Sequence, residues 1–254
     1  MTTHLDAFIA TTVLFQFELW ASTDSIVPER ETASSSKLTV NRMFATSGSL
    51  KLVFIKAVTA LATKNQSTLL PFLAYDPRKP IVASSALSNC TVAEYQTLFS
   101  RQQPLTANSL TLPVPPTHGT KSEALALWKQ LDQEIHYSFD TIEREHTMDI
   151  NQMSVLLSLL TESAPLQLVI DNPSLLSDIA RLVFSFPLLC YRGFAKLVAD
   201  NDPHALLVLY HFYRATRILL VGSRYWWALS QATALELSLS EWLIPTIGSC
   251  SAMG

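Results

Sequence analysis

The chain has 254 residues, of which 48% are hydrophobic and 15% are charged, whereas typical soluble domains carry roughly 25% charged residues. So much apolar surface requires a large core, an apolar pocket or a partner interface. The net charge of -3 excludes the overall basic field of a nucleic-acid-binding protein. The 6 glycines are few for a fold rich in hairpins or phosphate-binding loops, and this favours helices.

The 3 cysteines, Cys90, Cys190 and Cys250, lie far apart and show no C-x-x-C spacing. The sequence therefore predicts neither a zinc module nor a disulfide framework, and no metal or cofactor is expected. We expect reduced and mostly buried thiols, which are typical of a protein of the nucleus or the cytoplasm.

The first predicted helix covers residues 6–21, in which apolar side chains recur at close to helical spacing. Its apolar stretch at residues 7–15 also has the length of a signal-peptide core. However, His4 and Asp6 precede this stretch and no Lys or Arg does, which is wrong for a secretory signal. We therefore expect a helix of a soluble domain, and no membrane span elsewhere in the chain.

The next elements are separated by polar and proline-rich segments. Residues 22–39 predict a loop, and residues 38–62 predict a helical run that breaks near Gly48. Thr91 with Glu94 three residues later matches a capping box, so a short helix is expected to start at Thr91.

Four prolines in residues 101–120 exclude a helix there and disfavour a central strand. This segment is predicted to be either a surface loop of one domain covering residues 1–254 or a hinge between two helical layers. The surface loop is the favoured interpretation. Beyond it, residues 121–145 predict a long amphipathic helix with one apolar stripe, and residues 149–160 predict a short one.

The last third carries the clearest helix signals. Asp171 or Asn172 caps a helix that begins at Pro173, and this helix is expected to break or kink at Pro187. Asp202 repeats the start signal for a helix at residues 203–221, which is apolar nearly all round in its first half and is therefore predicted to be central. Gly222 ends it, and another helix follows at residues 225–237. Together these patterns predict an all-α, bundle-like fold of about 8–11 helices with no significant sheet.

Catalytic motifs are sparse, and the sequence predicts no enzyme. It contains no G-x-S-x-G, G-x-G-x-x-G or P-loop pattern. Glu143 and His146 form one Glu-x-x-His, but a di-iron bundle needs a second copy and further glutamates. His204 and His211 lie seven residues apart on one helix face. They are either a fragment of a metal or acid–base site or, as is commoner in a buried helix, hydrogen-bonded core residues.

Aromatic residues are concentrated in the last third of the chain, and two interpretations remain open. They either pack a solid core or wall an apolar pocket in which a few polar groups anchor a ligand. The residues predicted to line such a pocket are Phe184, Phe186, Leu206, Leu209, Tyr210, Tyr213, Trp226 and Trp227. Tyr210 or His211 is the predicted polar anchor for a ligand hydroxyl.

The segment VFSFPLLCYRGFAKLVADNDPHALLVLYHFYRATRILLVGSRYWW at residues 183–227, followed by SLSEWLIPTIG, resembles a known family. The family is the C-terminal regulatory domain of fungal binuclear zinc-cluster transcription factors, of the sterol uptake control protein type. The resemblance lies in residues 182–248 and is faint before them. The matching positions are Phe184 with Pro187, Phe194 with Leu197 and Val198, Pro203 with Ala205 and Leu206, Trp226 with Trp227, and Trp242.

The resemblance implies a transcriptional regulatory domain that senses an apolar ligand, such as a sterol. The family's DNA-binding module needs six closely spaced cysteines near the N-terminus, which this sequence lacks, so no direct binding to nucleic acid is expected. The alternative is a helical protein–protein interaction module with a solid core that modulates a full-length zinc-cluster regulator. The expected partners are a sterol-like or other apolar ligand and a second subunit, in a homodimer or in a heterodimer with a related transcription factor.

Overall fold

The computed structural model describes residues 2–21, 60, 69, 75, 80–81, 89–100, 102–111, 122, 126, 173–189, 192–221 and 223–251. Within these residues the chain forms six α-helices, one 3-10 helix and no strand, which confirms the predicted all-α class. The elements are α1 (Thr2–Ala21), α5 (Asn89–Phe99), η2 (Ala107–Leu110), α9 (Pro173–Leu189), α10 (Arg192–Ala199), α11 (Pro203–Leu220) and α12 (Trp226–Ser251). The predicted elements at residues 22–39, 38–62, 121–145 and 149–160 and the predicted stop at Gly222 lie outside the described residues, apart from single positions.

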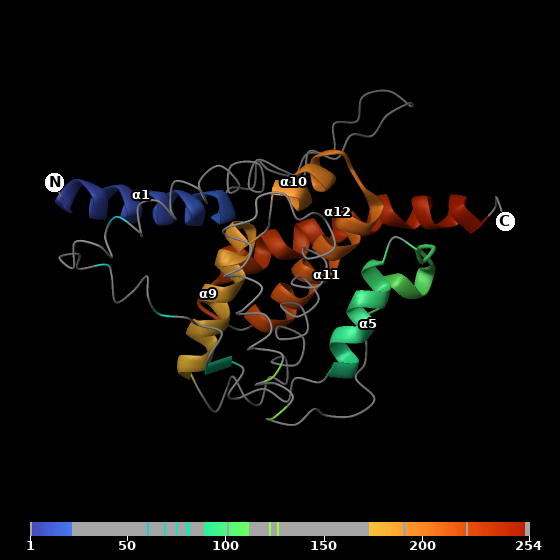
Figure 1. The fold of residues 1–254 in the computed structure, drawn as a ribbon, viewed down its shortest axis with the longest axis horizontal. Helices are drawn as coiled ribbons and strands as arrows, with labels where there is room; N and C mark the ends of the chain where they lie inside the picture. Colours follow the sequence, from blue (N-terminus) through green and yellow to red (C-terminus); the bar gives the residue numbers. More distant parts are fainter. Residues whose placement is uncertain are drawn as a thin grey trace.

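Helix α11 is the central element of the described fold. Nine consecutive residues, 205–213, are buried, so every side of the first half of this helix is covered by other parts of the protein. It runs beside α12 and also contacts α5, α9, α10 and η2 (Figure 1). The predicted central position of the apolar helix is therefore confirmed.

The turn that ends α10 has the hydrogen bonds of a Schellman motif. Asn201 adopts a φ of 56°, in the left-handed region that asparagine tolerates better than most residues. The Asn201 amide donates to the Val198 carbonyl at 3.1 Å, and the Asp202 amide donates to the Leu197 carbonyl at 2.9 Å. These bonds satisfy the carbonyls at the end of α10 and turn the chain directly into α11.

The start of α11 agrees with the sequence prediction. The Asp202 carboxylate Oδ1 accepts hydrogen bonds from the amides of His204 at 3.1 Å and Ala205 at 3.0 Å. Pro203, at the first helical position, has no amide hydrogen that needs a partner. Asp202 therefore caps α11 while its own amide completes the turn after α10.

Four predicted helix boundaries are wrong, and one of them is the start of α1, which lies four residues before the predicted residue 6. Helix α9 begins at Pro173 as expected, but it continues through Pro187 to Leu189 instead of breaking. Since Pro187 lies only two residues before the helix end, its missing amide removes a bond from the last turn alone. Helix α5 begins at Asn89, so Thr91 lies inside the first turn, where its buried hydroxyl has no hydrogen-bond partner among the described residues.

The predicted helix at residues 225–237 is too short. Helix α12 extends to Ser251 and contains Pro245. Apolar side chains on its inner face recur every four residues beyond Leu235, and this repeat continues the packing of α12. The buried residues of this repeat are Leu235, Leu239, Leu243 and Ile247.

Candidate functional site

The structure brings seven of the eight predicted pocket residues together in one hydrophobic core. Six of them are buried, and Trp227 is partly buried against the others. The eighth residue, Trp226, is 72% exposed and does not join them. The buried six are Phe184, Phe186, Leu206, Leu209, Tyr210 and Tyr213.

The aromatic rings of this core pack directly on one another. Phe186 of α9 stacks on Phe212 of α11, with ring centroids 3.8 Å apart and an interplanar angle of 10°. Phe184 stacks on Trp227 of α12 at 5.1 Å. Through these two stacked pairs, α9 packs against both α11 and α12.

Trp20 is a core residue that sequence reasoning did not single out. From the last turn of α1, its fully buried indole lies edge-on against Phe184 at 5.6 Å, Phe212 at 6.0 Å and Tyr213 at 6.1 Å. Trp20 lies in the predicted first helix, but no local pattern indicates a contact with rings more than 160 residues later.

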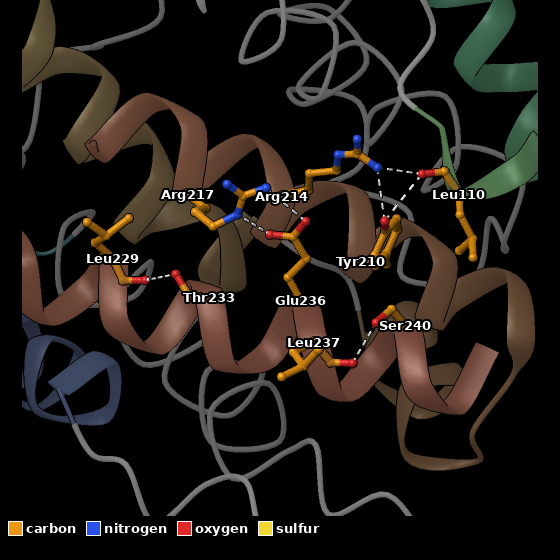
Figure 2. Close-up of polar contacts among 9 residues, drawn as sticks. All are labelled: Leu110, Tyr210, Arg214, Arg217, Leu229, Thr233, Glu236, Leu237 and Ser240. Carbon is orange, nitrogen blue, oxygen red and sulfur yellow. Dashed lines mark hydrogen bonds and ion pairs between the residues drawn. The ribbon is translucent and has the colours of Figure 1, made fainter. Parts of the chain in front are cut away.

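The polar groups of α11 bind the 102–111 segment, which contains η2. The Arg214 guanidinium donates to the Leu110 carbonyl at 2.6 Å and to the Tyr210 hydroxyl at 3.0 Å (Figure 2). The Tyr210 hydroxyl donates to the same Leu110 carbonyl at 3.3 Å. This part of the predicted Pro-rich loop is therefore anchored on the central helix.

His211 is the most buried polar group of this contact. Its side chain is 0% exposed, and its Nε2 lies 2.8 Å from the Ser109 carbonyl oxygen. Tyr95 and Phe99 of α5 flank the ring edge-on, each at 5.9 Å. Burial lowers the pKa of His211 to about 4, and the nearby Arg214 charge also acts to lower it.

The two histidines noted in the sequence share one role. The Nε2 atom of His204 lies 3.2 Å from the Gln103 carbonyl oxygen, near the start of the 102–111 segment. His211 contacts the Ser109 carbonyl, near its end. Both therefore contact backbone carbonyls of the 102–111 segment, but only His211 is a hydrogen-bonded core residue as predicted, because His204 is partly exposed. Tyr210 and His211, the predicted ligand anchors, are already bonded to the protein's own carbonyls.

Helices α11 and α12 are also joined by an ion pair. The Arg217 guanidinium pairs with the Glu236 carboxylate through two contacts, from Nε to Oε2 and from Nη2 to Oε1 (Figure 2). This bidentate geometry raises the pKa of Arg217, chiefly through the hydrogen bond to Glu236. The pair joins the two helices at a position where the Arg217 side chain is 36% exposed and the Glu236 side chain is 14% exposed.

The outer side of α12 carries a row of large apolar side chains, which we name the α12 stripe. Trp226, Leu237 and Ile244 are 72%, 59% and 57% exposed, and they share the row with Thr233. The hydroxyl of Thr233 donates to the carbonyl of Leu229 at 2.8 Å, so its donor is already used within the helix (Figure 2). The stripe is therefore mainly apolar, and the exposed side chains of Ser230 and Glu241 lie beside it on the same side of α12.

In the described part of the chain, no cluster of three or more His, Cys, Asp or Glu side chains is placed to hold a metal ion. None of the described helices combines the length and the apolarity needed to cross a membrane. In comparisons with known proteins, no protein-family model, no curated protein and no solved structure matches this chain.

Proposed function

We propose that this chain is an α-helical protein-interaction module that modulates a full-length zinc-cluster transcriptional regulator in the nucleus or the cytoplasm. The observation that carries this proposal is the contrast between a closely packed interior and an apolar exterior. In the interior, the rings of Phe186 and Phe212 stack directly on each other. On the exterior, Trp226, Leu237 and Ile244 lie exposed on α12. The class of partner comes from the resemblance of residues 182–248 to the regulatory domains of that family.

The α12 stripe has the spacing that a partner helix or groove requires. Trp226, Thr233, Leu237 and Ile244 follow one another at intervals of seven, four and seven residues, which keeps them on one side of an α-helix. Trp226 and Ile244 are about 27 Å apart along the axis. Apolar anchors at this spacing are the usual means by which one amphipathic helix binds another protein.

The hydrogen bonds of the buried polar groups favour a partner that binds at the protein surface over a ligand that binds in an interior pocket. The Tyr210 hydroxyl and His211 Nε2, which a ligand hydroxyl would need, are bonded to Leu110 and Ser109. A ligand at these atoms would have to replace hydrogen bonds that the protein already makes.

The experiment measures the affinity of the purified chain for a purified full-length zinc-cluster relative. Leu237→Glu and Ile244→Glu are expected to weaken binding at least tenfold, because each puts a charge on the α12 stripe. Val221→Glu is the matched control, since Val221 is an exposed apolar residue at the end of α11 and lies outside the α12 stripe. The proposal is wrong if the wild-type chain does not bind, or if the α12 variants bind as tightly as the control.

A second candidate function, the binding of a sterol-like ligand, is favoured by one observation. Among the described residues, His211 Nδ1, Arg214 Nε and Thr216 Oγ1 are buried and have no hydrogen-bond partner. Such atoms are uncommon in protein interiors and are available to a ligand hydroxyl. Solvent extraction of the purified chain followed by mass spectrometry tests this candidate. A stoichiometric sterol supports it, and a protein free of lipid contradicts it.

A further inference from the structure

The indole of Trp20 packs into a hole on the surface of the central helix α11. Leu209, Phe212, Tyr213 and Thr216 have the spacing i, i+3, i+4 and i+7, which places them at the four corners of one hole between helix side chains. The indole lies edge-on to the two middle residues, Phe212 at 6.0 Å and Tyr213 at 6.1 Å. It therefore lies over this hole, of which Thr216 forms the C-terminal corner.

The Thr216 side chain is a neighbour of the indole in the core. A side chain of an α-helix covers the turn that precedes its own Cα. The Thr216 side chain therefore covers the turn of Phe212 and Tyr213, on which Trp20 lies. Trp20 and Thr216 are both 0% exposed, so no bulk water reaches either of them.

Each of these two neighbours carries a polar atom that has no hydrogen-bond partner among the described residues. The atoms are Trp20 Nε1, which can only donate, and Thr216 Oγ1, which can both donate and accept. They do not bond each other either, although they lie in the same small region of an aromatic core. Such atoms are uncommon in protein interiors, because each gives up its hydrogen bonds to water on folding.

Other threonines in the described helices use their hydroxyls differently from Thr216. Each of them donates to the carbonyl four residues earlier, at 2.8–3.1 Å. These residues are Thr11, Thr12, Thr97, Thr233 and Thr246. Thr91 is only the third residue of α5, so that helix has no carbonyl four residues before it. The Thr216 hydroxyl forms no such bond with the Phe212 carbonyl, and it is therefore available to a group outside α11.

We propose that Trp20 and Thr216 together bind one buried hydroxyl oxygen, which belongs to a water molecule or to the alcohol group of a small apolar ligand. The oxygen accepts a hydrogen bond from Trp20 Nε1 and forms a second hydrogen bond with Thr216 Oγ1. An oxygen of this kind both donates and accepts, so it satisfies both atoms at once. A buried water needs only about 10–15 Å³ and two to four polar partners, so the site requires no large cavity.

The bound oxygen links the last turn of α1 to the centre of α11. Helix α1 otherwise packs chiefly against α9 and α12. Because hydrogen bonds are directional, the oxygen orients the indole within its hole as well as satisfying it. This inference does not depend on the surface interaction proposed for α12. It also requires no sterol-like ligand, because a water molecule is enough.

The first test replaces the Thr216 hydroxyl by a methyl group of similar size. If the hydroxyl holds a bound oxygen, Thr216→Val removes one of the partners of that oxygen, and the midpoint of thermal unfolding is expected to fall by about 3 °C or more. If the hydroxyl has no partner, the same change removes an unsatisfied polar group, and the midpoint rises. An unchanged or raised midpoint therefore overturns the inference.

Thr12→Val is the matched control for this test. Thr12 is a buried threonine of α1 whose hydroxyl donates to the Phe8 carbonyl at 2.9 Å. Its hydroxyl has the ordinary helical partner, and that carbonyl is also within reach of a helix amide. The control is therefore expected to change the midpoint by less than about 1 °C.

The second test detects the oxygen by nuclear magnetic resonance of the isotopically labelled chain. The Trp20 indole N–H is the signal that Trp20→Phe removes, and its ring contacts with Phe212 and Tyr213 assign it without any substitution. We expect a nuclear Overhauser effect from this N–H to a long-lived water or to the protons of a bound alcohol, and we expect Thr216→Val to abolish it. The indole of Trp226 is the internal control. It is 72% exposed and meets rapidly exchanging bulk water, which gives no effect of this sign.

Solvent extraction followed by mass spectrometry distinguishes the two sources of the oxygen. An alcohol recovered in stoichiometric amount identifies a ligand, whereas a chain that is free of small molecules and keeps the Overhauser effect identifies a water; either result supports the site. The absence of a sterol contradicts the second candidate function and leaves this inference standing. The inference is overturned if the Trp20 N–H shows no effect to water or ligand, or if it contacts a hydroxyl or carbonyl of the chain itself.

Discussion

The imidazole of His211 and the carbonyl of Ser109 lie 102 residues apart in sequence and 2.8 Å apart in space. Because a carbonyl oxygen only accepts hydrogen bonds, Nε2 of His211 carries the proton and donates it. Because burial lowers its pKa to about 4, the ring is neutral at pH 7, and its unprotonated Nδ1 has no hydrogen-bond partner among the described residues. A second proton would place a charge in a fully buried site close to the Arg214 guanidinium.

This contact predicts a loss of stability at acidic pH. Burial lowers the pKa of His211 from 6.5 to about 4, so between these values the unfolded chain binds a proton that the folded chain does not. The contribution of neutral His211 to the free energy of unfolding is fully present above pH 6.5. It falls by an amount on the order of 3 kcal/mol as the pH drops towards 4. Urea unfolding at pH 7 and pH 5 measures it.

The matched comparison uses two histidine variants. His211→Gln keeps a side-chain donor but cannot titrate, so its free energy of unfolding is expected to fall less between pH 7 and pH 5 than that of the wild type. His204→Gln removes the other histidine that contacts the 102–111 segment, and it should keep the wild-type pH dependence. The prediction would be contradicted if the free energy of unfolding changed with pH in the same way for the wild type and for His211→Gln.

Arg214 is predicted to control the opening of the 102–111 segment. Arg214→Met removes the donor to the Leu110 carbonyl and leaves that carbonyl with the Tyr210 hydroxyl alone. Since hydrogen bonds from charged groups contribute roughly 1.5–3 kcal/mol, amide exchange in residues 102–111 should accelerate at least tenfold. Hydrogen exchange with mass spectrometry resolves this segment.

Arg217→Met is the control for this experiment. Arg217 lies three residues further along α11 and pairs with Glu236 of α12, so its loss should speed exchange in α12 and not in residues 102–111. Equal acceleration of the segment by both variants would mean that its stability follows the whole fold rather than the Arg214 contact.

The parts of this fold that the sequence predicts are those set by local chemistry. Asp202 and Pro203 signal the start of α11 because a carboxylate and an imino acid act on the next few amides alone. The uninterrupted apolar run at residues 205–213 predicts a helix covered on all sides for the same reason. The burial of the core residues of α11, including Leu206 and Leu209, follows from these two signals.

The parts that the sequence does not predict depend on distant partners. No local rule pairs Trp20 with Phe212, and none indicates that backbone carbonyls near a proline-rich stretch bind His211 and Arg214. Trp226 was predicted to lie with Trp227, yet successive helix positions point about 100° apart, so only Trp227 reaches the core. The sequence therefore predicts the apolar cluster of the candidate site. It does not predict which polar groups already form hydrogen bonds within the protein.

The stacked pair of Phe186 and Phe212 is predicted to contribute strongly to stability. Phe212→Ala removes a fully buried ring that contacts Phe186 and Trp20, and it should lower the free energy of unfolding by roughly 3–5 kcal/mol. Trp226→Ala is the control, because this exposed ring should change the free energy of unfolding by less than about 0.5 kcal/mol. Denaturant unfolding of both variants gives the comparison, and a similar small loss for both would mean that the pair is loosely packed.

A substitution at Leu209 separates the two candidate functions. Leu209 is fully buried on α11, in a core where the neighbouring rings already lie in contact. In a solid core, Leu209→Trp adds volume that the surroundings cannot accept, and it is expected to lower the free energy of unfolding by about 1–3 kcal/mol. The same change at exposed Leu237 adds a ring in solvent and should leave the free energy of unfolding nearly unchanged. Equal stability of the two tryptophan variants would mean that space exists beside Leu209, and the sterol-like ligand would then become the better explanation of this core.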